Sequence, residues 1–120
     1  MNIIFGKAQV ESLPDNKFIV LELDQIQYGE HGRPDSAYCV VENVPITELP
    51  DVEHNLKLHK QLILSYRQRE WQNCYNLIDH LRGKWGGDVD SFYGDLYQRV
   101  LHLENQVLPD DWTGTITKAV

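Results

Sequence analysis

The sequence predicts an α+β fold in which a three-stranded antiparallel meander packs on three C-terminal helices. Two observations lead to this prediction. Residues 2–44 contain three runs of strand-forming residues separated by turn residues. From residue 47 onward, apolar positions recur every three to four residues, which is the period of an α-helix. The chain has 120 residues, the length of one domain, and we divide it into the meander (1–46), the helices (47–108) and a tail (109–120).

The three predicted strands span residues 2–10, 18–28 and 36–44. A turn, SLPDNK, follows the first strand, and a glycine-bearing loop, GEHGRPD, follows the second. If that loop closes symmetrically, the numbers of opposed residues sum to 64, and Leu23 faces Val41. Alternation along the strands then places one set of apolar residues on the core face: Ile19, Leu21, Leu23, Cys39 and Val41.

The opposite face of this strand pair is acidic. It holds Val20, Glu22, Asp24, Tyr38, Val40 and Glu42, and the same register puts Glu22 opposite Glu42. Like charges directly opposed are unfavourable, so either water screens them or a basic group or divalent cation lies between them. Glu22, Asp24 and Glu42 are therefore weak candidates for a metal site.

The first helix is predicted over residues 51–68. Thr47 is its candidate cap, acidic residues occupy its first turn, and Pro50 stands where a missing N–H does no harm. Leu58 and Leu64 lie outside its main apolar stripe. A helix that is apolar on more than one side is covered either by its own fold or by a partner.

The second helix lies within SYRQREWQNCYNLIDHLRGKW, where arginines alternate with aromatic residues. Its apolar stripe is continuous and comprises Trp71, Cys74, Tyr75, Ile78, Leu81 and Trp85. The rings therefore belong to the core and do not form a platform for nucleic-acid bases. A third helix is predicted over residues 90–108, where Leu101 and Leu108 widen its apolar band, and Trp112 anchors the tail.

Charge is distributed unevenly around a formal net charge of −7, which disfavours general binding to nucleic acid or anionic membranes. Residues 1–56 carry ten acidic and three basic residues, whereas residues 57–84 carry six basic and two acidic ones. The two halves can pack on each other, or either can bind a partner of opposite charge. The bases could form an edge that contacts a few phosphates: Lys57, Lys60, Arg67, Arg69, Arg82 and Lys84.

No catalytic, metal or cofactor motif is evident. The two cysteines, Cys39 and Cys74, are far apart and outside any CxxC motif, which predicts buried free thiols in a reducing cytoplasm. The five histidines lack the i, i+4 spacing with an adjacent acid of a helical zinc site. GKWGGD resembles a phosphate loop, but its lysine precedes the glycines. We expect no cofactor, no membrane span and no signal peptide.

The C-terminal half resembles the tetratricopeptide-like tail that follows the catalytic domain of many bacterial class III nucleotidyl cyclases. The matching positions are Tyr66, Arg67, Trp71, Tyr97, Pro109, Trp112, Gly114, Thr117 and Lys118, and Arg99 stands one residue earlier than the family's Tyr-x-x-Arg pattern places it. Cys74 departs from the family, where a small alanine is usual, and only one repeat-like unit is present. The cyclase chemistry lies in a domain outside this resemblance, so no catalytic residue is implied. The whole chain also resembles small proteins of marine tailed phages, especially those infecting cyanobacteria.

These observations predict a non-enzymatic protein–protein interaction module, and the phage resemblance suggests an accessory protein in the host cytoplasm. Its partner would be a second copy, as a dimer or small oligomer, or another protein. The predicted contact residues are Leu58, Leu64, Leu101 and Leu108. Two alternatives are a metal or ligand binder that uses the acidic strand face, and a single-strand nucleic-acid binder that uses the basic edge.

Overall fold

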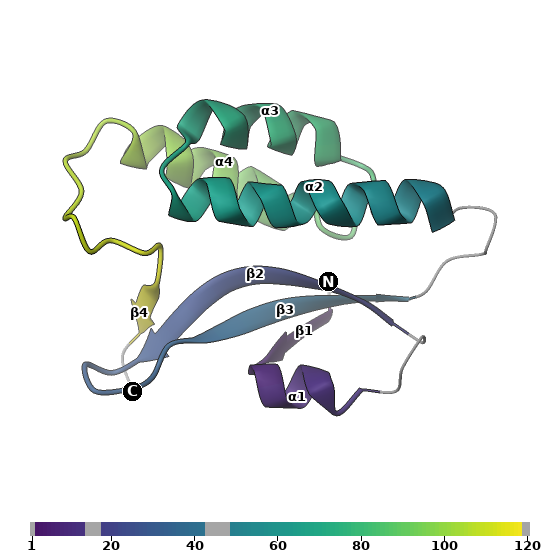
Figure 1. Cartoon of the computed structure of the whole chain (residues 1–120), viewed down its shortest axis with the longest axis horizontal. Coiled ribbons are helices and arrows are strands. Elements are labelled where there is room, and N and C mark those ends of the chain that lie inside the picture. The colour runs from purple at the N-terminus through teal and green to yellow at the C-terminus, as the bar shows by residue number, and fades with distance from the viewer. Residues whose placement is uncertain (1, 14–17, 43–48, 119–120) are drawn as a thin grey trace. The chain divides into compact units, whose positions relative to one another are not determined.

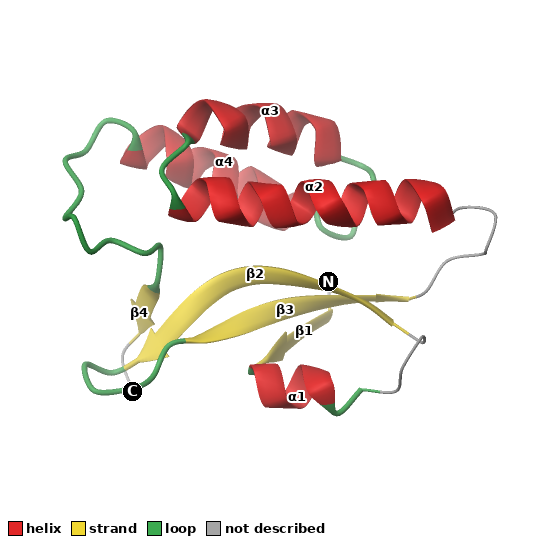
Figure 2. Ribbon diagram, in the orientation of Figure 1, coloured by secondary structure: helices red, strands yellow, loops and turns green. Residues whose placement is uncertain are grey.

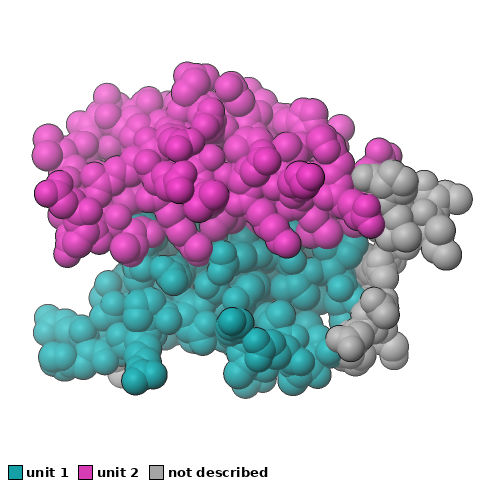
Figure 3. Space-filling model, in the orientation of Figure 1, with its two compact units in different colours: residues 1–43, 114–120 teal, residues 44–113 magenta. Residues whose placement is uncertain are grey.

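The computed structural model describes residues 2–13, 18–42 and 49–118 and confirms the α+β class (Figures 1 and 2). The chain forms two compact units (Figure 3). Residues 1–43 and 114–120 make the sheet unit, and residues 44–113 make the helical unit. The predicted cap at Thr47 and most of the SLPDNK turn lie outside the described residues.

The sheet unit contains a four-stranded mixed sheet. β2 (Phe18–Tyr28) and β3 (Asp35–Glu42) form the predicted antiparallel pair, and β1 (Asn2–Phe5) pairs antiparallel with β3. β4 (Ile116–Lys118) adds a parallel strand on β2, so the order is β1-β3-β2-β4. A simple meander would place β1 beside β2. Here β3 lies between β1 and β2, and β4 occupies the other edge of β2.

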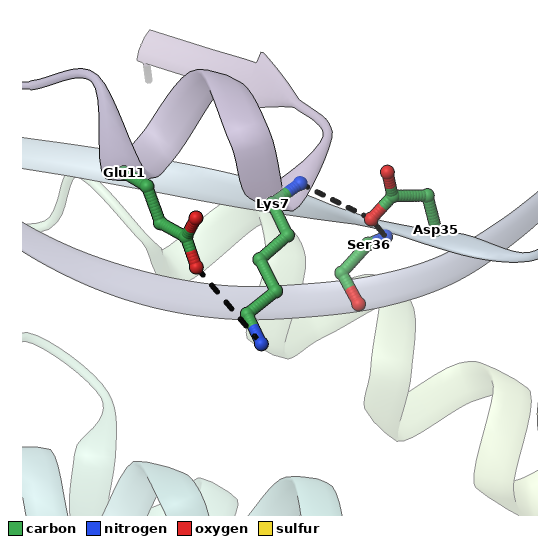
Figure 4. Close-up of polar contacts among 4 residues, drawn as sticks. All are labelled: Lys7, Glu11, Asp35 and Ser36. Carbon is green, nitrogen blue, oxygen red and sulfur yellow. Dashed lines mark hydrogen bonds and ion pairs between the residues drawn. The ribbon is translucent and has the colours of Figure 1, made fainter.

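The first strand is shorter than its predicted span of 2–10, because the chain turns at Gly6. Gly6 has φ of 100°, a conformation that favours glycine, and its N–H donates to the Ser36 carbonyl at 2.9 Å. The short helix α1 (Lys7–Glu11) follows. The Asp35 carboxylate accepts hydrogen bonds from the backbone N–H groups of Lys7 at 3.1 Å and Ser36 at 2.8 Å (Figure 4). A side chain from β3 therefore satisfies the first turn of α1.

The predicted register of β2 and β3 is wrong by four residues. Leu21 lies opposite Cys39, so the numbers of opposed residues sum to 60, and Leu23 does not face Val41. The register shifts between Glu22 and Gln25, which marks a β-bulge. Because a shift of four preserves the alternation, the predicted core face is retained: Ile19, Leu21, Leu23 and Cys39 are buried, and Val41 is partly buried.

The helical unit comprises α2 (Leu49–Arg67), α3 (Trp71–Leu81) and α4 (Asp90–Leu103), and α3 contacts both of its neighbours (Figure 1). The third helix ends five residues before its predicted end. The Gln106 N–H donates to the Leu103 carbonyl at 3.1 Å, which closes a turn, and Val107 is fully exposed. Residues 104–106 are polar and exposed, so extending the helix over them would bury no apolar surface, and the helix ends before Pro109.

α2 ends in a Schellman motif whose left-handed residue is an arginine. Arg69 has φ of 63°, its N–H donates to the Tyr66 carbonyl, and the Glu70 N–H donates to the Ser65 carbonyl. This is the hydrogen-bond pattern that usually places glycine at the left-handed position. The two bonds turn the chain directly from α2 into α3.

The predicted apolar stripes form the core of the helical unit. Leu62 on α2, Cys74 and Ile78 on α3, and Leu96 on α4 have no exposed surface. Tyr66, Trp85, Phe92 and Tyr93 are also buried, whereas Trp71, Tyr75 and Tyr97 are partly buried. The aromatic rings of the helical unit therefore lie largely in its interior, as their spacing predicts.

Candidate functional site

The most polar part of the helical core is a buried network of three side chains. The Trp85 indole N–H donates to the Tyr93 hydroxyl oxygen at 3.0 Å, and that hydroxyl lies 2.9 Å from Nδ1 of His59. Trp85 can only donate, so the Tyr93 hydroxyl oxygen accepts from it. The same hydroxyl shares a second hydrogen bond with Nδ1 of His59. The network orders the core, and with exposed fractions of 1% for His59 and none for Tyr93 it cannot meet a ligand.

The motif aromatics that carry the family resemblance form a second cluster. The ring of Trp112 lies 5.4 Å from that of Tyr66 and 5.8 Å from that of Trp71, and both pairs meet edge to face. The Arg69 guanidinium lies 5.5 Å from the Trp112 ring, and it also donates to the Pro109 carbonyl. These residues attach the segment after α4 to the α2–α3 turn, which assigns them a structural role.

A groove on the surface of the helical unit runs between α2 and α3. Its volume is about 360 Å³, within the range of binding pockets. Its lining residues are two leucines and six residues with polar side chains: Gln61, Leu64, Ser65, Gln68, Glu70, Asn73, Asn76 and Leu77. Leu64 is 54% exposed, and Leu77 on the opposite helix is partly buried. Asn73 donates to the Glu70 carboxylate at 2.7 Å and so positions this acid at the α2–α3 turn.

The four predicted contact leucines are not brought together. Leu64 lines the groove, but Leu58 on α2 is partly buried, and neither Leu101 nor Leu108 is among the lining residues. Leu101 lies on α4 and is 36% exposed, and Leu108 follows that helix. The polar α3 side of the groove was missed in the sequence, because Asn73 and Asn76 resemble an ordinary solvated helix face.

The acidic strand face does not form as predicted. Glu22 lies opposite Tyr38, and Glu42 lies opposite Phe18, so the expected Glu22–Glu42 pair is wrong. Tyr38, the residue opposite Glu22, is four positions from Glu42 along β3, so about 13 Å of strand separates the two acidic positions. Glu22 instead accepts a hydrogen bond from the Ser36 hydroxyl at 2.7 Å. Asp24 is partly buried on the bulged part of β2, and no group of three or more potential metal ligands occurs among the described residues.

The six basic residues are distributed along the helical hairpin and over both of its ends. Lys57 and Lys60 lie near the middle of α2, and Arg67 and Arg69 lie at the α2–α3 turn. Arg82 and Lys84 follow the other end of α3, and the Arg82 guanidinium lies 5.4 Å from the Tyr97 ring. Two of the six cations thus contact aromatic rings of the helical unit itself.

The cysteine of α3 is chemically quiet. Burial, followed by the nearby Glu70 charge, raises the pKa of Cys74 to about 12, so its thiol stays protonated at neutral pH. The neighbouring Tyr75 also has its pKa raised to about 12, first by burial and then by Glu104. His54 and His80 face each other across α2 and α3 with ring centroids 6.1 Å apart. These groups do not assemble the nucleophile, base and orienting acid of a covalent catalyst.

Comparisons with known proteins leave the site to be interpreted on its own geometry. No protein-family model, curated protein or solved structure matches the chain. None of the described helices combines the length and the apolar character needed to cross a lipid bilayer.

Proposed function

We propose that this chain is a non-enzymatic protein–protein interaction module, and that its partner binds the α2–α3 groove. The exposure of Leu64 supports this proposal most directly, because a leucine 54% open to water gains free energy when a partner covers it. It lies in a groove, where a ligand can contact it from several sides. The phage resemblance extends the proposal to an accessory protein that acts on another protein in an infected cell.

The groove lining supports binding without catalysis. Apart from its two leucines it offers amides, one hydroxyl and one carboxylate, and it contains no histidine, cysteine, lysine or arginine. Amides and hydroxyls make directional hydrogen bonds but are poor general acids and bases at neutral pH. Such a surface can recognise a partner with few polar contacts around an apolar centre.

A peptide-display selection tests this proposal. The wild-type chain serves as bait for a library of random peptides, and the selected peptides are then measured against Leu64→Ser and Leu101→Ser. Leu101 is the matched control, since it is also an exposed helical leucine but lies outside the groove lining. We expect the selected peptides to bind Leu64→Ser about tenfold more weakly and Leu101→Ser unchanged, because an interfacial leucine contributes at least about 1.4 kcal/mol.

The proposal fails if no peptide is enriched, or if the enriched peptides bind Leu64→Ser as tightly as wild type. Sedimentation velocity of the same three proteins examines a second copy as the partner. A dimer that dissociates in Leu64→Ser but persists in Leu101→Ser would identify the groove as a self-association surface.

A further inference from the structure

We propose that the groove binds an extended peptide segment with an aliphatic side chain and, at the Glu70 end, a lysine or arginine. This inference rests on the proposed function and specifies the chemistry of the partner. The aliphatic side chain would contact Leu64 and Leu77, and the base would pair with the Glu70 carboxylate.

The hydrogen-bonding groups of the groove are complementary to a polypeptide backbone. Gln61 and Gln68 on α2, and Asn73 and Asn76 on α3, each present a carbonyl oxygen and an NH₂ group. A peptide backbone likewise presents one acceptor and one donor per residue. A phosphate or a carboxylate would instead be repelled by the Glu70 carboxylate, and none of the lining residues is a cation that could offset this repulsion.

The charge of the groove determines which peptide it prefers. Glu70 is the one charged residue in the lining, and the 2.7 Å hydrogen bond from Asn73 holds its carboxylate beside the groove. Lys57 and Lys60 lie about one turn before Gln61 and Leu64 on α2, so the opposite end of the groove disfavours a second base. Within the lining, Glu70 is thus the group that favours a base, and it places that base at the α2–α3 end of the groove.

The size of the groove favours an extended strand over a helix. Its α2 side runs from Gln61 to Gln68, eight residues that span about 10 Å of helix. About three residues of an extended chain cover that length. A helical ligand would need a longer row of apolar contacts, spaced over two or more turns, than Leu64 and Leu77 provide.

Four short peptides with acetylated and amidated ends test the inference. Each has nine residues, a serine–glycine background, and one central triplet: Lys-Ser-Leu, Leu-Ser-Lys, Glu-Ser-Leu or Leu-Ser-Glu. The two orders are needed because the direction of the chain in the groove is not assumed, and alternate residues of an extended chain point to the same side. Titrations are followed by the NMR signals of the side-chain amides of Gln61, Gln68, Asn73 and Asn76.

We expect one lysine peptide to bind about fivefold more tightly than its glutamate counterpart, the upper range of an exposed ion pair. Glu70→Gln should abolish this difference. Glu53→Gln makes the same charge change at an exposed α2 position outside the groove lining, and it should preserve the difference.

Equal binding of the lysine and glutamate peptides, or tighter binding of a glutamate peptide, would overturn the inference while leaving the interaction module intact. The inference is also overturned if millimolar peptide moves none of the four amide signals. In that case the display selection decides separately whether the proposed function itself fails.

Discussion

Replacing Tyr93 with phenylalanine removes one oxygen atom from the centre of the helical unit. That oxygen accepts from the Trp85 indole at 3.0 Å and contacts Nδ1 of His59 at 2.9 Å, and none of the Tyr93 surface is exposed. The substitution removes the partner of the buried Trp85 indole N–H and a partner of the buried His59 ring nitrogen, and each loss costs about 1–3 kcal/mol. We expect the free energy of unfolding to fall by about 3 kcal/mol, a large part of the 5–15 kcal/mol typical of a domain.

Urea unfolding followed by circular dichroism measures this loss. Tyr97→Phe is the control, because it removes the same atom from a partly buried tyrosine on the same helix and should cost less than about 1 kcal/mol. A double-mutant cycle with His59→Leu should show a coupling of about 0.5–3 kcal/mol, since the two side chains are in contact. A Tyr93→Phe protein within 1 kcal/mol of wild type would show that the hydroxyl does not connect the two rings, and the network would have to be abandoned.

Three further predictions concern backbone strain and ionisation. Arg69→Gly should be more stable than Arg69→Ala by about 1 kcal/mol in urea unfolding. Both variants lose the contact with Trp112, but only alanine retains the strain of the left-handed conformation. The reverse order of stability would contradict the Schellman turn. Gly6→Ala should lower the midpoint of unfolding and cost about 1–3 kcal/mol, since Gly6 has φ of 100°, and an unchanged midpoint would argue against the turn that ends β1. The pKa of Cys74 is raised to about 12 in the folded protein, against about 9 in the unfolded chain. The stability that the protonated thiol contributes is therefore complete below about pH 9. It is lost between pH 9 and 12 at up to about 1.4 kcal/mol per pH unit. Cys74→Ala should therefore show a shallower loss of stability than wild type over that range, and parallel curves would exclude the contribution.

The helical unit could be predicted well because its signals are local. Apolar spacing alone identified the three helices and the inward direction of Ile78 and Tyr93, since the side that a helical residue occupies depends only on its position. Trp85 is buried as expected, but it lies in the turn region after α3 ends at Leu81. The end of α4 was misplaced because Val107 continues the pattern without being buried.

The sheet was predicted less accurately because strand pairing depends on contacts between distant residues. The core face was correct, since the register error of four residues preserves the alternation of side chains. The bulge after Glu22 and the pairing of β1 with β3 have no local signature. The turn at Gly6 does have one, a glycine within an otherwise strand-like run, which is a known sign of a break or bend.

The candidate site could be predicted only in part. Leu64 was identified because it falls outside the buried stripe of α2, but the amides that accompany it come from α3. Glu70 lies next to Arg69 in the α2–α3 turn, and its place in the groove lining and its hydrogen bond from Asn73 depend on how the two helices pack. Polar residues on two helices become a site only through helix packing, which sequence periodicity does not determine.

Hydrogen exchange of the tryptophan indole protons is the most direct test of whether the rings of the helical unit lie inside it. The Trp85 indole N–H is bonded to Tyr93 in a side chain that is only 6% exposed. After transfer to D₂O, its NMR signal should persist as long as the most protected backbone amides of α3 and disappear only on global unfolding. Exchange of that proton at the rate of free indole would show that Trp85 faces solvent, and it would contradict the core described for the helical unit.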